Sequence, residues 1–343
     1  MKKIFFFIFL FFLFTSCTKE EGKITTVADL RHGTQGLVFS FLPGNPPDAM
    51  YESKEGSSDG TFSVLSMVEN KGVSNIEHGY LTLNYEKNYL SLVSDSWRFQ
   101  DKIISPTNEV TIPFSLKGKS LDNPSGDTAT VGVLLKTKEI ESLSEFRQSL
   151  LSLTACYDYA TQITIPVCID TDPYNIKKIT KPCSIQDVSF VDQGAPVAIT
   201  NAKFSMLPSG KDAAVLEVIL SIANKGTGLV VNVLNSKDKQ LQYDNLALAC
   251  SSAGQTGDKV KNLFNVVGLD LKLSLDSENK FECSPLPILL EHGTQDVRCI
   301  YKGNVPKGNT YSTVLNAKLS YGYSETISKE MKIERNPSLH ESN

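Results

Sequence analysis

Short stretches in which apolar and polar residues alternate recur along the chain. Residues 109–117 and 128–136 are two examples in the first half, and 269–275 and 296–301 are two in the second. Successive side chains of a strand point to opposite faces, so each stretch would have one apolar and one polar face. Polar segments with Gly and Pro separate the stretches, which is typical of a β-sandwich. The pattern therefore predicts an all-β protein.

The same pattern occurs twice, in diverged form. Residues 62–72 (FSVLSMVENKG) resemble residues 216–226 (LEVILSIANKG), with alternate apolar positions in register and a shared Asn-Lys-Gly at the end. Gly tolerates positive φ, so this tripeptide predicts a turn after each strand. Residues 153–159 and 315–323 form a second related pair, and each ends in Tyr-x-Tyr. Two landmarks in the same order predict two homologous modules.

One stretch has helical rather than alternating spacing. Apolar residues between positions 140 and 150 fall three or four residues apart. Ser142 and Glu145 have the spacing of a capping box. A short helix inserted in the first module is therefore expected.

The N-terminus has the features of an export signal. Lys2 and Lys3 precede an unbroken apolar run, Ile4–Phe14, which is shorter than the roughly 20 residues that cross a membrane. The run ends in Phe-Thr-Ser-Cys17, which resembles the lipobox of bacterial lipoproteins, although Phe14 stands where that pattern usually has Leu. The resemblance implies that Cys17 is acylated and anchors the protein to a membrane. The alternative is an ordinary signal peptide followed by an incidental cysteine.

These features divide the chain into six parts. The segment after Cys17 is polar, and the stretch between the modules mixes Pro, Lys and polar residues. The exported protein would be held at the surface or at the periplasmic face of the cell envelope. The predicted parts are a signal peptide (1–16), the lipidated cysteine with a flexible tether (17–35), a first β-sandwich module (36–170), a linker (171–184), a second β-sandwich module (185–334) and a polar tail (335–343).

The turn sequence suggests a family. A strand that ends in Asn-x-Gly, early in a sandwich of an exported protein, is similar to the CARDB type of immunoglobulin-like module found on bacterial and archaeal surface proteins. Residues 68–72 (VENKG) and 222–226 (IANKG) carry the resemblance. It implies two tandem immunoglobulin-like β-sandwich modules. The cysteines and the long insertions depart from the usual module.

Charge and motifs exclude several classes of protein. The 34 Lys and Arg against 38 Asp and Glu give a net charge of −4 without a basic block, so no nucleic-acid partner is expected. The four histidines are scattered, with no His-Glu-x-x-His and no zinc-like spacing to a cysteine pair. There is no Gly-x-Ser-x-Gly elbow and no phosphate-binding loop. We therefore expect no enzyme, no cofactor and no metal site.

The remaining cysteines are even in number, which predicts disulfides in an exported chain. Free thiols and a metal site are the alternatives. The candidates are Cys156, Cys168, Cys183, Cys250, Cys283 and Cys299.

The expected bridges follow from two predicted hairpins. Each hairpin would bring the cysteines that flank it onto adjacent strands, the first around a turn near Thr161 and the second within residues 284–298. The third bridge follows by elimination. The expected pairs are Cys156–Cys168, Cys283–Cys299 and Cys183–Cys250.

Two groups of side chains are candidates for binding. Asp170 and Asp172, near the predicted linker, have part of the spacing of a calcium loop, and solvated linker acids are the alternative. A group of aromatic residues could stack on a sugar or anchor a protein partner, and the alternative is that it fills the core. These aromatic residues are Tyr80, Tyr85, Tyr89 and Trp97.

The anchor, the duplicated sandwich and the missing catalytic motifs favour a non-enzymatic function. We expect a surface adhesion, spacer or assembly module, with the membrane as one partner through acylated Cys17 and a protein or glycan as another. The alternative is a ligand-binding lipoprotein that captures a glycan or a peptide.

Overall fold

The computed structural model describes residues 26, 28–108, 110–172, 174, 176, 180–209, 213–234, 239–251, 263–274, 278, 280–303, 305 and 310–340. Strands dominate this part of the chain. Its helical elements are the short 3-10 helix η1 (Ala28–Leu30) and the α-helices α1 (Lys239–Cys250) and α2 (Pro337–His340). The prediction of an all-β protein is confirmed.

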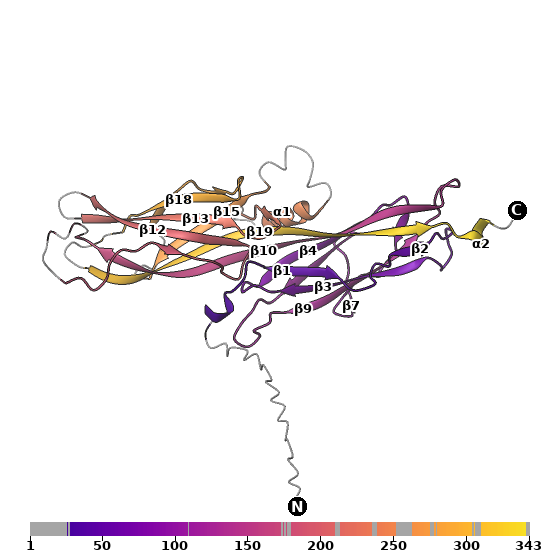
Figure 1. Ribbon diagram of the computed structural model, residues 1–343, viewed down its shortest axis with the longest axis horizontal. Helices are drawn as coiled ribbons and strands as arrows, with labels where there is room; N and C mark the ends of the chain where they lie inside the picture. The colour runs from indigo at the N-terminus through magenta and orange to yellow at the C-terminus, as the bar shows by residue number, and fades with distance from the viewer. Residues whose placement is uncertain are drawn as a thin grey trace, which may run out of the picture.

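Two very long strands run through the whole molecule. β10 (Phe146–Asp170) and β19 (Thr310–Glu334) each have 25 residues. They pair antiparallel, from Phe146 opposite Glu334 to Asp170 opposite Thr310. At about 3.3 Å per residue such a pair is about 80 Å long. We call it the central ribbon, and it extends from one end of the elongated molecule to the other (Figure 1).

The strands form three sheets, and the largest contains the central ribbon. The first sheet has the order β1 (Leu37–Phe41), β3 (Thr61–Asn70), β9 (Thr128–Thr137), β6 (Arg98–Phe99) and β7 (Lys102–Ile103), with β5 (Leu90–Leu92) also on β9. The second has the order β17 (Ile288–Leu289), β15 (Val266–Leu273), β19, β10, β4 (Ile76–Asn84) and β8 (Thr111–Leu116), with β14 (Leu229–Val231) and β2 (Ala49–Tyr51) on β19. The third has the order β11 (Val188–Ser189), β12 (Val197–Ser209), β13 (Ala213–Asn224), β18 (Thr294–Tyr301) and β16 (Phe281–Ser284).

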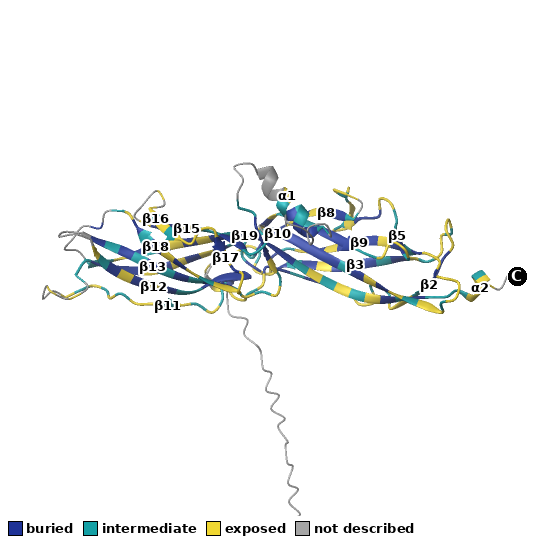
Figure 2. Cartoon of the chain, turned by 90° about the horizontal axis from the view of Figure 1, so that it is seen from above, coloured by how far each residue is buried: buried dark blue, intermediate teal, exposed yellow. Residues whose placement is uncertain are grey.

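These sheets make two lobes along the central ribbon (Figure 1). The first lobe combines the first sheet with β4, β8 and the Phe146 end of β10. The second lobe combines the third sheet with β15, β17 and the Asp170 end of β10. Buried residues of both lobes belong to one continuous hydrophobic core, which follows the strands through the molecule (Figure 2).

This arrangement differs from two modules joined by a linker. β10 and β19 each contribute one end to each lobe. Neither lobe is therefore built from residues 36–170 or from residues 185–334 alone. Of the predicted linker, residues 171–184, the part that the structure describes follows β10, whose end lies at the outer end of the second lobe rather than between the lobes.

The duplicated Tyr-x-Tyr motifs meet at the middle of the central ribbon. Tyr157 lies opposite Tyr323, and Tyr159 lies opposite Tyr321. All four side chains are buried, and the rings of Tyr157 and Tyr159 meet edge to face with centroids 5.6 Å apart. Because the two strands are antiparallel, each copy of the motif faces the other at the junction of the lobes.

Each Asn-Lys-Gly turn is tied to the central ribbon by the same hydrogen bond. The Tyr159 hydroxyl donates to Asn70 Oδ1 at 3.1 Å, and the Tyr323 hydroxyl donates to Asn224 Oδ1 at 3.0 Å. The amide nitrogen of each asparagine side chain donates to a backbone carbonyl four residues later. A Cβ at Gly72 would collide with the Tyr159 hydroxyl, which explains the glycine. The two sequence repeats thus make equivalent contacts.

The helix predicted within residues 140–150 is wrong. β10 begins at Phe146, turns precede it, and the Leu143 side chain is 97% exposed. Pairing with β19 supplies backbone hydrogen bonds that overrule the local spacing. The longer of the two described α-helices is α1, which belongs to an insertion between β14 and β15.

Six cysteines form three disulfides, but only one of the expected pairs is present. The hairpin expected around Thr161 does not exist, because Cys156 and Cys168 lie in the same extended strand. At about 3.3 Å per residue they are about 40 Å apart, far beyond bonding distance. The observed bridges are Cys156–Cys250, Cys168–Cys183 and Cys283–Cys299.

The Asn70 side chain is fully buried and makes four hydrogen bonds, so Asn70→Ala should be strongly destabilising. The substitution leaves the Tyr159 hydroxyl and the Gly72 amide without their acceptor, at about 1–3 kcal/mol for each buried group. We expect the free energy of unfolding, measured by urea denaturation, to fall by about 3 kcal/mol. Lys71→Ala, next to it but exposed, is the control and should change stability by less than about 1 kcal/mol. Equal losses in both variants would contradict the role of Asn70.

Candidate functional site

A groove of about 920 Å³ lies at the middle of the central ribbon, where the two lobes meet. Its walls come from β4, β10 and β19, from the segments that follow η1, β3, β8 and β14, and from α1. This volume is in the range of small-molecule sites, which occur preferentially between domains. We call it the junction groove.

The acidic side chains of the junction groove are already engaged. Asp158 stands between the two tyrosines of the first motif, and these face the core, so Asp158 points to the opposite face. Its Oδ1 accepts hydrogen bonds from the backbone amides of Glu77 and His78 at 3.1 and 3.0 Å. Its Oδ2 lies 3.3 Å from Nδ1 of His78. Glu77 accepts a hydrogen bond from the Asn75 side chain at 3.1 Å.

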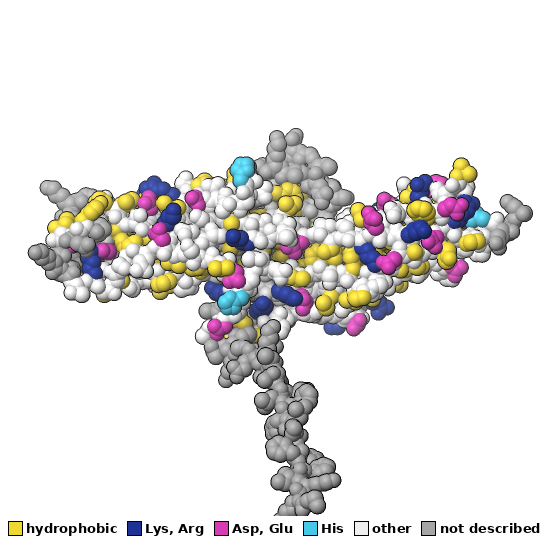
Figure 3. Space-filling view, in the orientation of Figure 1, with side chains coloured by type: hydrophobic (Ala, Val, Ile, Leu, Met, Phe, Trp, Pro, Cys, Tyr) yellow, Lys and Arg dark blue, Asp and Glu magenta, His cyan; other side chains and the backbone are white. Residues whose placement is uncertain are grey.

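The basic side chains of the junction groove lack such partners. Arg31, Lys119 and Lys318 line it, and none of the three forms an ion pair with a described carboxylate. Arg31 Nη1 donates to the Gln162 carbonyl at 2.6 Å, while its buried Nε has no hydrogen-bond partner among the described residues. Lys318 lies directly opposite Gln162 on the central ribbon. Lys and Arg side chains are visible where the lobes meet in Figure 3.

The aromatic candidates pack against the hydrophobic clusters and lie outside the junction groove. Trp97 is 1% exposed and belongs to the core. Tyr85 and Tyr89 pack against the same core, and the Tyr89 hydroxyl donates to Glu141 at 2.7 Å. Tyr80 packs against the small cluster around α1. None of the four lines the junction groove. The core interpretation of Trp97 is confirmed.

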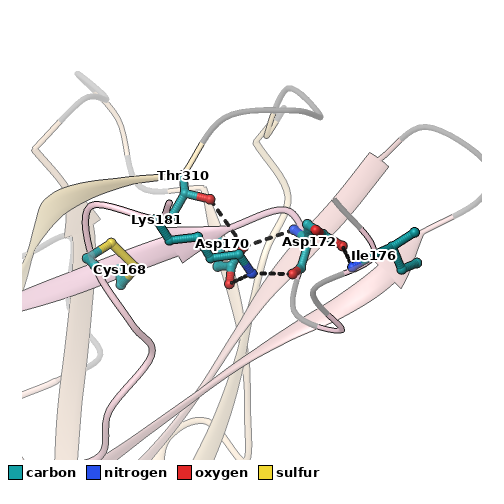
Figure 4. A network of polar contacts seen from close by, with 7 residues as sticks. Cys168, Asp170, Asp172, Ile176, Lys181 and Thr310 are labelled. Atoms are coloured by element: carbon teal, nitrogen blue, oxygen red, sulfur yellow. Dashed lines mark hydrogen bonds and ion pairs between the residues drawn. A yellow bond between two sulfur atoms is a disulfide. The ribbon is translucent and has the colours of Figure 1, made fainter. Parts of the chain in front are cut away.

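The acidic candidates near the predicted linker hold a lysine rather than a metal ion (Figure 4). Asp170 Oδ2 lies 2.7 Å from Nζ of Lys181, and both side chains are largely buried. Asp170 Oδ1 accepts hydrogen bonds from the Asp172 amide at 2.9 Å and from the Thr310 hydroxyl at 3.2 Å. Lys181 also donates to the Asp172 carbonyl. The network and the Cys168 bridge fix the chain as it turns away from β10.

The described residues contain no group of three or more His, Cys, Asp or Glu side chains that could hold a metal ion. Among the same residues, no helix is long and apolar enough to cross a membrane. Cys17 and the predicted signal peptide lie outside the described residues. The three disulfides are consistent with an exported protein.

No protein-family model matches the sequence, and no curated protein matches it. The function must therefore be inferred from the geometry.

Sequence reasoning missed the junction groove, although one signal was available. The two Tyr-x-Tyr motifs differ at their middle position, which is Asp158 in the first copy and Gly322 in the second. The alternation of a strand directs that position away from the core. An acidic residue there marks a polar site on the outer face. The partners of that site come from segments far apart in the sequence, and no spacing reveals them.

The copies differ at a second position, two residues after the last tyrosine. The first copy has Thr161, whose hydroxyl lies 2.9 Å from the Tyr321 hydroxyl. The second has Glu325, whose carboxylate forms no hydrogen bond or ion pair with another described residue. Burial without a partner raises the pKa of Glu325 to about 7.

Asp170→Asn should destabilise the second lobe. Burial raises the pKa of Asp170, but the hydrogen bonds from Lys181 and the Asp172 amide outweigh it, so the pKa is lowered. The ion pair therefore stabilises the fold above about pH 4, and this contribution is lost as the pH falls through the folded-state pKa. We expect a loss of about 3 kcal/mol at pH 7, measured by urea denaturation, and a smaller difference from the native protein below pH 4.

The control for this variant is Asp122→Asn, at an exposed acidic residue. It should leave the free energy of unfolding within about 0.5 kcal/mol of the native protein. A loss in Asp170→Asn that stayed constant from pH 7 to pH 2 would argue against the ion pair as its cause.

Glu325→Gln should stabilise the protein at high pH. The raised pKa means that the folded state prefers the protonated carboxyl, so stability declines as the pH rises from about 4.5 to about 7. Glutamine stays neutral at every pH, so the variant should not lose this part of its stability as the pH rises. At 1.4 kcal/mol per pKa unit, reduced by solvent screening at this partly exposed position, we expect a gain of about 1–2 kcal/mol at pH 8 and almost none at pH 4.5.

Thermal unfolding across this pH range measures the effect. Glu330→Gln, at an exposed position of the same strand, is the control and should show no such pH dependence relative to the native protein. If Glu325→Gln were no more stable than the native protein at pH 8, the carboxylate would not be an unfavourable buried charge.

Proposed function

We propose that this protein is a lipid-anchored, exported and non-enzymatic adhesion or assembly module of the cell envelope. The central ribbon carries the proposal, because two paired strands of 25 residues make a continuous bar between the ends of the molecule. Three disulfides are consistent with an oxidising compartment. The lipobox-like Phe-Thr-Ser-Cys17 supplies the anchor in this proposal.

The attachment point favours adhesion or assembly over a spacer. η1 lies beside the middle of the molecule (Figure 1). The residues after it are held there, since Arg31 donates to the Gln162 carbonyl and the Gly33 amide donates to Asp192 at 2.8 Å. A chain anchored through Cys17 would therefore be held near its midpoint, with both ends available for contacts. A spacer would instead be attached at one end.

The duplication is compatible with the CARDB-like character that we propose for the two lobes. The repeated Asn-x-Gly turns support it, because each turn is held by an equivalent tyrosine of the central ribbon. The shared strands set this protein apart from a chain of independent modules.

Protease shaving of intact cells, followed by mass spectrometry, tests the location and the anchor. We expect peptides from both lobes to be released and an acylated Cys17 peptide to stay in the membrane. A Cys17→Ser variant is the control and should leave the membrane fraction. Full protection of both lobes would contradict an outward-facing protein, and a Cys17→Ser variant that stayed in the membrane would contradict the lipid anchor.

Photo-cross-linking on cells tests whether the ends make the contacts. A photoreactive residue at Leu143, before β10 begins, or at Ile176, after β10 ends, should cross-link to envelope macromolecules. Met67, exposed on the face of β3, is the control position and should cross-link less. Cross-linking at Met67 alone would contradict the use of the ends.

A further inference from the structure

We propose that the junction groove is a binding site for a small amphiphilic anion, meaning a carboxylate or phosphate group on an apolar body. The site is independent of the adhesion or assembly role proposed above. It rests on basic side chains that have no described carboxylate partner and on apolar side chains that line the same groove.

The charge of the junction groove favours an anion. Its acids are occupied, because Asp158 accepts from two amides and contacts His78, and Glu77 accepts from Asn75. Arg31 and Lys318 have no described carboxylate partner, and neither has Lys119. The three lining cations outnumber the two lining carboxylates of Asp158 and Glu77, so the groove has a net positive formal charge, which attracts an anion in a partly enclosed site.

The acid opposite Lys318 on the neighbouring strand is paired with another lysine. Asp270 lies opposite Lys318 in the pairing of β15 with β19. Its carboxylate lies 3.7 Å from the ammonium group of Lys272 on its own strand. Lys318 therefore keeps its ammonium group available to the groove.

The donors suit a carboxylate or a phosphate. A guanidinium has five N–H donors, and one terminal nitrogen of Arg31 is fixed by the Gln162 carbonyl. That bond holds the side chain in place and leaves other donors for a ligand. Lys119 follows β8 and Lys318 belongs to β19, so cations from three separate segments line one groove.

The apolar lining requires more than an inorganic ion. Val73, Val233, Leu234 and Leu246 also line the junction groove. Three of the four belong to the insertion between β14 and β15, which has no counterpart in the uninterrupted β4 of the first lobe. The Cys156–Cys250 bridge fixes this insertion to the central ribbon. An apolar ligand body beside these side chains would be removed from water.

The asymmetry of the two copies supports a site at this place. Gly322 replaces Asp158 in the second copy, and a Cβ there would press against Leu246 of α1. The glycine therefore lets the insertion lie close to one half of the ribbon centre. The other half, around Asp158, remains the open groove.

Isothermal titration calorimetry on the full mature chain carrying Cys17→Ser tests the proposal. The probes are decanoate and decyl phosphate, with decanol as the uncharged match and decyltrimethylammonium as the match of opposite charge. We expect saturable one-to-one binding of at least one anion, at least tenfold weaker binding of decanol, and none of the cation. The anion that binds more tightly identifies the headgroup. Equal binding of decanol, or binding of the cation, would overturn the proposal.

Variants locate the site. Arg31→Gln with Lys318→Gln should weaken anion binding at least tenfold, and Lys203→Gln, at an exposed lysine of β12, should not change it. Thermal unfolding should show that all variants remain folded. If the double variant does not fold, Lys318→Gln alone tests the site, because Lys318 is exposed and its replacement leaves the core unchanged. Unchanged affinity in the double variant would overturn the site.

A chain-length series tests the apolar part. Butanoate should bind at least tenfold more weakly than decanoate, because each buried CH₂ group contributes to affinity. Equal affinities would mean that the groove takes a bare anion and would overturn the amphiphilic character.

Discussion

The antiparallel pairing of β10 with β19 is the constraint on which the rest of the structure depends. Strands in globular proteins usually have five or six residues, whereas each of these has 25. The largest sheet is assembled around the ribbon, since β4 joins β10 while β15, β14 and β2 join β19. Each lobe needs both strands, so the lobes cannot fold as independent units. We therefore expect one cooperative unfolding transition rather than two.

Many strands and turns of this fold were predictable, because a few residues of alternating apolar and polar character are enough to indicate a strand. Alternation between Phe62 and Val68 fixed a face, and the repeat of Asn-Lys-Gly located two equivalent turns. Pairing partners were not predictable, because alternation gives no information on which strand lies alongside. The Tyr-x-Tyr motifs looked like two module ends and are instead one ribbon centre. The prediction of a turn at Thr161 was wrong for the same reason, and so was the predicted Cys156–Cys168 bridge.

The candidate site was less predictable than the fold, because it arises where the two copies differ. Duplication gives both halves the same buried tyrosines and the same turn contacts. Asp158 against Gly322, and Thr161 against Glu325, break that symmetry next to the centre of the ribbon. Burial without a described partner raises the pKa of the Glu325 carboxyl. A duplicated scaffold thus keeps its core contacts equivalent and changes the positions around the junction.

The outer edge of β10 explains why the N-terminal segment lies at the middle of the molecule. β4 stops pairing at Tyr157, and beyond that point the described pairing of β10 is with β19 alone. An open edge invites pairing with another chain. Pro166 lies four residues after Gln162 in the same strand, so its backbone faces the same edge as the Gln162 carbonyl. Proline has no N–H and therefore cannot donate a hydrogen bond to a pairing strand there.

The bridge from Cys168 holds the returning chain at the outer end of that edge, and Arg31 covers the Gln162 carbonyl at its inner end. The segment that leads from the proposed anchor therefore protects the edge and lines the junction groove with the same side chain. Attachment elsewhere on the molecule would give up both contacts. The position of the described residues after η1 thus follows from the half of β10 whose outer edge has no described strand partner, and the groove depends on it.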